Sequence, residues 1–128
     1  MTADVAALRA EVTRICLALP EATTRLSHGA DAFQAGGKKM FAYFVDNHHG
    51  SGITAVLVKT TGPDEQEMLI ESDPALYYRP PYIGGWGWVG VRVDPDGWDG
   101  GKPDWEHVAE RIRHSYRLTA PRRLAELV

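Results

Sequence analysis

Residues 82–93 read YIGGWGWVGVRV, and the turn DPDG follows at residues 94–97. In the first half, glycines interrupt aromatic side chains, and glycine lets a backbone turn tightly or approach another group closely. The second half alternates as a short β-strand does, and Asp-Pro-Asp-Gly is a strong turn signal. This segment therefore predicts an aromatic loop that leads into a short strand, and it indicates a fold more clearly than it indicates a chemistry.

The size of the chain fits one domain. Its 128 residues, 44% hydrophobic and 24% charged, are typical of a single globular domain spanning residues 1–128. No apolar run approaches the roughly 20 residues of a membrane helix, and the N-terminus lacks the pattern of a signal peptide. The single cysteine, Cys16, cannot form an internal disulfide, which fits a reducing compartment. We therefore expect a cytoplasmic protein.

The charge balance is mildly acidic. The formal net charge is -3 and the pI is near 5.9. Dedicated nucleic-acid binders usually carry a basic balance, because phosphate neutralisation supplies most of their affinity. The charges are segregated, with an acidic run at residues 64–73 and five arginines between residues 111 and 123. The balance argues against DNA as a partner without excluding a local basic patch.

Two kinds of hydrophobic spacing divide the chain. Helical spacing near the N-terminus predicts a helix over residues 4–18, with Thr2 as its cap. Alternating runs separated by short turns then predict antiparallel strands at residues 23–26, 32–35, 40–45 and 53–58. A second helix begins at Pro63, strands follow at residues 77–79 and 88–93, a long helix begins at Asp104, and residues 122–128 form a terminal helical turn. Because prolines follow it, the segment at 77–79 belongs to an edge strand or a loop and not to a central strand.

This order of elements predicts an α+β fold. One helix, three or four strands, a helix, two strands and a helix are best arranged as two layers, with a twisted antiparallel sheet backed by helices.

Five blocks of sequence resemble the YjbR/MmcQ family. They are SHGADAF at residues 27–33, GGKKMFA at 36–42, PYIG at 81–84, GWVGV at 87–91 and SYRLTAPRRL at 115–124. The likeness covers nearly the whole chain, and the blocks fall in the family's order. It implies a compact α+β domain with a double-wing fold, whose members are commonly labelled DNA-binding. It brings no catalytic residue set.

Four cations are candidates for contacts to nucleic acid or another anion: Lys38, Lys39, Arg79 and Arg92. The two lysines follow a Gly-Gly turn and precede a predicted strand, where they could contact phosphate. The simpler interpretation of that pair is a solvated turn whose lysines guard a strand end.

Aromatic side chains form a second candidate site. Tyr82, Trp86 and Trp88 lie among glycines, and such residues are enriched where recognition occurs. Together with His28 they could line a cleft that accepts a planar ligand. In the alternative interpretation, Trp88 packs into the core under the last helix and Trp86 covers an edge, while His28 is a buried, hydrogen-bonded turn residue.

No pattern indicates a catalytic or metal site. His107, Glu110 and His114 share one helix face, which we interpret as a solvated face. His48-His49 lies in a turn-rich loop, and Cys16 continues an apolar stripe. We therefore expect no catalytic residue, metal or cofactor.

The sequence favours a small non-enzymatic binding protein. Weak DNA binding is one hypothesis for its function. The alternatives are a small-molecule binder for planar aromatic compounds and a protein-interaction module. A monomer and a homodimer are both compatible with the sequence.

Overall fold

The computed structural model describes residues 4–37, 39–47 and 50–128. Among these residues, six strands form one sheet in the order β1-β2-β3-β4-β6-β5, and every neighbouring pair is antiparallel. The strands are β1 (Ala22–Ser27), β2 (Ala30–Ala35), β3 (Met40–Asp46), β4 (Thr54–Val58), β5 (Tyr77–Tyr78) and β6 (Val89–Arg92). The helices are α1 (Val5–Leu17), α2 (Pro63–Ser72), α3 (Trp105–Thr119) and the short α4 (Arg122–Ala125). The predicted α+β class is confirmed.

The local predictions hold to within a few residues. The four predicted strands of the meander are β1 to β4, Pro63 opens α2, and Asp104 caps α3 by accepting from the backbone of Glu106 and His107. The predicted cap Thr2 lies outside the described residues, and Asp4 caps α1 by accepting from the N–H of Ala7. β5 is an edge strand, as the prolines that follow it predict.

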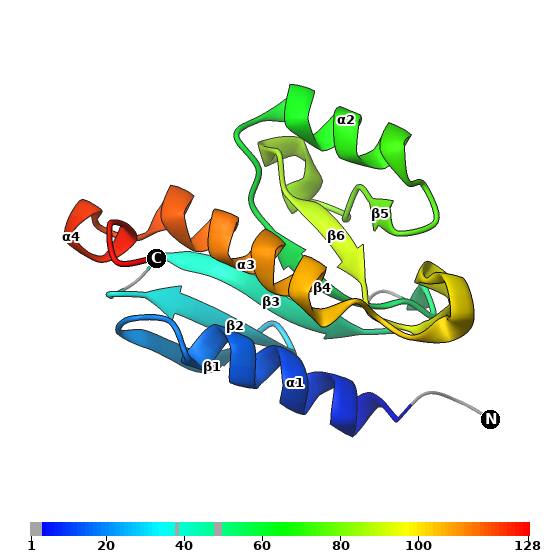
Figure 1. Ribbon diagram of the computed structural model, residues 1–128, viewed down its shortest axis with the longest axis horizontal. Coiled ribbons are helices and arrows are strands. Elements are labelled where there is room, and N and C mark those ends of the chain that lie inside the picture. The colour runs from blue at the N-terminus through cyan, green and yellow to red at the C-terminus, as the bar shows by residue number, and fades with distance from the viewer. Residues whose placement is uncertain (1–3, 38, 48–49) are drawn as a thin grey trace.

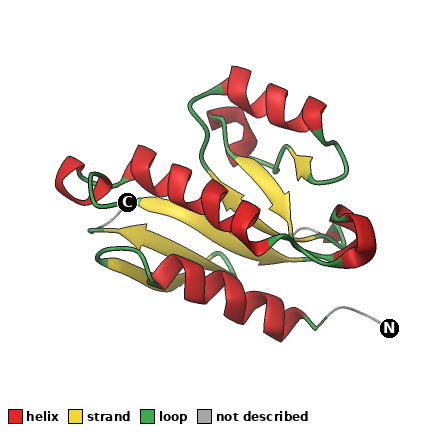
Figure 2. Ribbon diagram, in the orientation of Figure 1, coloured by secondary structure: helices red, strands yellow, loops and turns green. Residues whose placement is uncertain are grey.

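Helices α1 and α3 pack side by side against one face of the sheet (Figures 1 and 2). Successive side chains of a strand point to opposite faces of the sheet, so alternate apolar residues face these helices. Val56 and Val58 of β4 do so, and they join the main core with Phe33, Ile112 and Tyr116.

A buried serine ties α3 to the sheet. The hydroxyl of Ser115 donates to the carbonyl of Phe41 at 2.6 Å and accepts from the N–H of Lys59 at 2.8 Å. These two bonds fix the height of α3 over β3 and β4.

The register of the strands sets what the opposite face displays. A single row of directly paired residues crosses all six strands, in the order Arg25, Ala32, Tyr43, Leu57, Gly90 and Tyr78. Tyr78 lies over Gly90, where an added Cβ would come within 2.3 Å of the phenol ring. Glycine is therefore required there for the edge strand to pack. A smaller apolar cluster on this face contains Val45, Ala55, Leu57 and Trp88.

Candidate functional site

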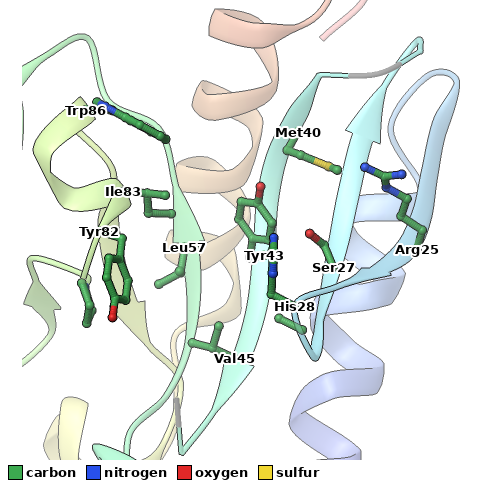
Figure 3. A pocket seen from close by; sticks show the side chains of 12 residues that line it. Arg25, Ser27, His28, Met40, Tyr43, Val45, Leu57, Tyr82, Ile83 and Trp86 are labelled. Atoms are coloured by element: carbon green, nitrogen blue, oxygen red, sulfur yellow. The ribbon is translucent and has the colours of Figure 1, made fainter. Parts of the chain in front are cut away.

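A pocket with a volume of about 650 Å³ lies on the sheet face opposite α1 and α3 (Figure 3). It is bounded on one side by the β1–β2 hairpin and on the other by the loop that follows β5. Its volume falls in the range of about 300–1,000 Å³ that is typical of small-molecule sites.

The floor of the pocket is apolar and comes from the two central strands. Met40, Tyr43 and Val45 of β3 and Leu57 of β4 supply it, with their side chains directed away from the helices. The ring of Tyr43 packs against that of Trp88, with centroids 5.3 Å apart. Burial raises the pKa of the Tyr43 phenol, and the nearby charge of Arg25 opposes this shift. The phenol therefore remains a neutral hydrogen-bond donor at neutral pH.

Trp88 is buried, as the alternative interpretation expects, but it lies on the opposite face of the sheet from the last helix. It does not itself line the pocket. The face that it joins is the pocket face, where its ring lies 5.7 Å from the Nζ atom of Lys59. Burial, and then the charge of Lys39, lower the pKa of Lys59. Lys59 therefore lies beside the tryptophan that supports the pocket floor, and Lys39 is near enough for its charge to act on Lys59.

The aromatic wall consists of Pro81, Tyr82, Ile83 and Trp86, which come from the loop and the 3₁₀ turn η2 (Ile83–Trp86). Tyr82 is 83% exposed and Trp86 is 78% exposed, although both are large aromatic side chains. Tyr82 has φ 64° and ψ -73°, and the N–H of Ile83 donates to the carbonyl of Pro81 at 2.8 Å. These values define a γ-turn with positive φ, a rare and strained conformation for a non-glycine residue.

A buried glutamine on α2 positions this loop. Gln66 is 2% exposed, and its side-chain amide donates to the carbonyls of Gly84 at 2.7 Å and Trp88 at 2.6 Å. The hydroxyl of Thr60 donates to the carbonyl of Gly87 at 2.6 Å. Side chains that precede the loop by about twenty residues therefore hold its middle, at Gly84, and its C-terminal end, at Gly87 and Trp88. Gln66 was not predicted as a functional residue, and the one local signal for it is a polar side chain three positions before the buried Leu69.

The wall on the other side is polar and comes from the β1–β2 hairpin. Arg25, Ser27 and His28 line it (Figure 3). His28 and Gly29 form the two-residue turn with φ of 52° and 80°, the positive values that tight hairpins require. His28 is a turn residue as expected, but it is exposed and not buried. Arg25 and Tyr43 could not be predicted from the sequence, because only strand pairing places them on the pocket face.

The four predicted anion contacts come from different elements. Lys38 lies outside the described residues, and Lys39 precedes β3 near Lys59. Arg79 packs against Gly84, whose position has no room for a Cβ beside the arginine side chain. Arg92 forms an ion pair with Asp94 at 2.6 Å, and this charge-assisted contact raises the pKa of the guanidinium.

The histidine face of α3 is solvated in part. His107 and Glu110 are exposed, as that interpretation expects, whereas His114 is half-buried. The Nε2 atom of His107 lies 2.5 Å from the Tyr77 hydroxyl, and that of His114 lies 3.0 Å from Glu65. Both histidines therefore connect α3 to the α2–β5 region. In the described part of the chain, no group of three or more His, Cys, Asp or Glu residues could hold a metal ion.

Two other predictions concern residues away from the pocket. Cys16 is fully buried, and burial raises the pKa of its thiol. His48 and His49 lie outside the described residues. Over the described ranges, no helix is long and apolar enough to cross a membrane.

These features define a small α+β domain with a ligand-sized pocket on the sheet face that α1 and α3 leave open. The family model for YjbR matches residues 17–118, so the chain belongs to the YjbR family.

A solved structure has a similar fold. It is the crystal structure of the Deinococcus radiodurans protein DR2400, with a DUF419 domain; the TM-score is 0.65 and the sequence identity 19%. The match covers 86% of this chain and 76% of that one. No curated protein matches the sequence significantly.

Proposed function

We propose that this chain is a small non-enzymatic binding protein whose ligand is a planar small molecule held in the pocket of the open sheet face. The observation that carries the proposal is an apolar pocket of about 650 Å³ whose rim displays two exposed aromatic side chains. Exposed Tyr and Trp side chains are typical of recognition sites, since one part of each ring is apolar and one part polar.

The strained turn at Tyr82 supports the same site. A residue held in an unfavourable conformation costs about 1–3 kcal/mol, and such residues cluster at ligand sites. Gln66 and Thr60 anchor the loop at Gly84, Gly87 and Trp88. The pocket wall is therefore held in place before any ligand binds, which lowers the entropic cost of binding.

A neutral aromatic probe tests the proposal. N-phenyl-1-naphthylamine should bind with a saturable rise in its fluorescence, and Trp86→Ala should weaken binding at least about fivefold, since a lost stacking contact costs about 1 kcal/mol or more. Met68→Ala is the matched control, because Met68 is also a large exposed apolar side chain but lies on α2 outside the pocket lining. Equal binding by all three proteins, or no binding, would refute the proposal.

DNA binding is the second hypothesis, and it follows from the cations Lys38, Lys39, Arg79 and Arg92. The ion pair of Arg92 with Asp94 and the net charge of -3 both weaken it. Tryptophan fluorescence titrated with short duplex DNA at low and at physiological salt separates the hypotheses. A saturable change that disappears at physiological salt and in Lys39→Ala would favour DNA over the pocket ligand.

A protein-interaction module is the third hypothesis. Tyr82 and Trp86 are exposed enough to be covered by a partner or by a second copy of the chain. Analytical ultracentrifugation distinguishes this case, because a dimer that dissociates in Trp86→Ala would place the aromatic wall in an interface.

A further inference from the structure

The two walls of the pocket differ in chemistry. One presents Pro81, Ile83 and two aromatic rings, whereas the other presents a guanidinium, a hydroxyl and an imidazole from Arg25, Ser27 and His28. A molecule that fills the space between them has an apolar end against the first wall and a polar end against the second.

The charge at the polar wall is positive. Among the described residues that line the pocket, none is Asp or Glu, and Arg25 makes no ion pair with any described carboxylate. Arg92, which occupies the same sheet face near the other edge, is neutralised by Asp94. Arg25 is therefore available to a ligand in a way that Arg92 is not.

Strand register brings a second donor to the same part of the pocket. Arg25 pairs with Ala32, and Ala32 pairs with Tyr43, so the arginine and the tyrosine lie two strands apart in one row. Neighbouring strands are about 4.8 Å apart, which places the two backbones roughly 10 Å from each other, with only the methyl group of Ala32 between their side chains. An acidic group between them can meet both a guanidinium and a phenolic O–H.

We infer that the ligand is a planar aromatic anion, a ring system carrying one carboxylate, sulfonate or phosphate group, with Arg25 as the residue that selects the charge. This inference rests on the proposed function, since it assigns the ligand class of the same pocket. The ring lies between Tyr43 and the aromatic wall, and the anionic group lies at the β1–β2 hairpin beside Arg25. The lysine pair Lys39 and Lys59 adds positive potential beside the floor.

Two fluorescent probes with one skeleton test the inference. N-phenyl-1-naphthylamine is neutral, and 8-anilinonaphthalene-1-sulfonate is the same ring system with a sulfonate. The anionic probe should bind about tenfold more tightly than the neutral one, as expected for one charge-assisted hydrogen bond. In Arg25→Gln the ratio of the two affinities should fall towards one, while the affinity for the neutral probe stays within about twofold of the wild-type value. Arg25→Lys should retain part of the preference, because it keeps the charge but loses the planar fork.

The control variant is Arg117→Gln, which removes the same charge from an exposed position on α3, on the other side of the sheet. It should leave the preference unchanged, and circular dichroism should show the same fold for all variants. If the neutral probe binds but the sulfonate adds nothing, or if Arg117→Gln reduces the preference as much as Arg25→Gln, the inference is wrong and the pocket still stands. If neither probe binds, the proposed function itself is wrong.

Discussion

Replacement of Gln66 by leucine should destabilise the protein by about 1–2 kcal/mol. The amide of Gln66 donates to the carbonyls of Gly84 and Trp88, and leucine fills a similar volume without a donor. A buried carbonyl left without its partner costs about 1–3 kcal/mol. The Gly84 carbonyl keeps a bond from the N–H of Gly87 at 3.2 Å, so most of the loss comes from Trp88. The added apolar burial offsets about 1 kcal/mol.

Urea unfolding followed by far-ultraviolet circular dichroism measures this loss, and binding of N-phenyl-1-naphthylamine measures its effect on the pocket. Because the amide holds the aromatic wall at Gly84 and the chain just after it at Trp88, binding should weaken as well, although Gln66 does not line the pocket. The control is Glu67→Gln, an exposed neighbour on α2, which should change stability by less than about 0.5 kcal/mol. An unfolding midpoint for Gln66→Leu equal to that of the wild type would refute the bridging role of the amide.

Three further predictions concern the strained turn at Tyr82, the buried phenol of Tyr78 and the hydroxyl of Ser115 that ties α3 to the sheet. Tyr82→Gly should leave the free energy of unfolding unchanged or raise it by about 1 kcal/mol, because relief of the positive φ exceeds the entropy cost of glycine. The same variant should bind the probe more weakly. A fall of more than about 1 kcal/mol in the free energy of unfolding in urea would contradict this prediction. Burial raises the pKa of Tyr78 to about 12, so the stabilisation from its buried neutral phenol is complete below pH 10 and disappears as the pH rises towards 12. Tyr78→Phe should therefore make the free energy of unfolding less dependent on pH in that window. An unchanged dependence on pH would be evidence against the burial effect. Ser115→Ala should lower the free energy of unfolding in urea by about 2–3 kcal/mol, because the N–H of Lys59 and the carbonyl of Phe41 both lose a hydrogen-bond partner. A loss below about 0.5 kcal/mol would show that water replaces the hydroxyl.

The main elements of the fold could be predicted from local patterns. Apolar alternation and short turns located β1 to β4, and proline and acidic caps located the starts of α2 and α3. These signals depend on residues a few positions apart, which the chain carries whether or not it has folded. The aromatic wall was predictable for a related reason. Glycines beside Tyr82 and Trp86 indicate a tightly turning loop, and aromatic side chains on such a loop are typical of recognition sites.

The rest of the candidate site depends on contacts between distant segments. Arg25 and Tyr43 are separated by seventeen residues along the chain and share a row only because both pair with Ala32. Gln66 belongs to a helix and serves a loop some twenty residues later. His107 and His114 have the spacing of an exposed helix face, and nothing in that spacing predicts that their rings contact Tyr77 and Glu65.

Local patterns along the chain specify the class of domain, its helices and strands, and the aromatic segment that forms one wall of the pocket. The tertiary structure alone decided that the sheet presents an open face, that Arg25 faces this wall across the pocket and that Trp88 supports the floor instead of the helix layer. The physical reason is that a strand's pattern indicates that it has two faces, whereas only its pairing register and the helices packed on the sheet decide which face stays open and which side chains meet there.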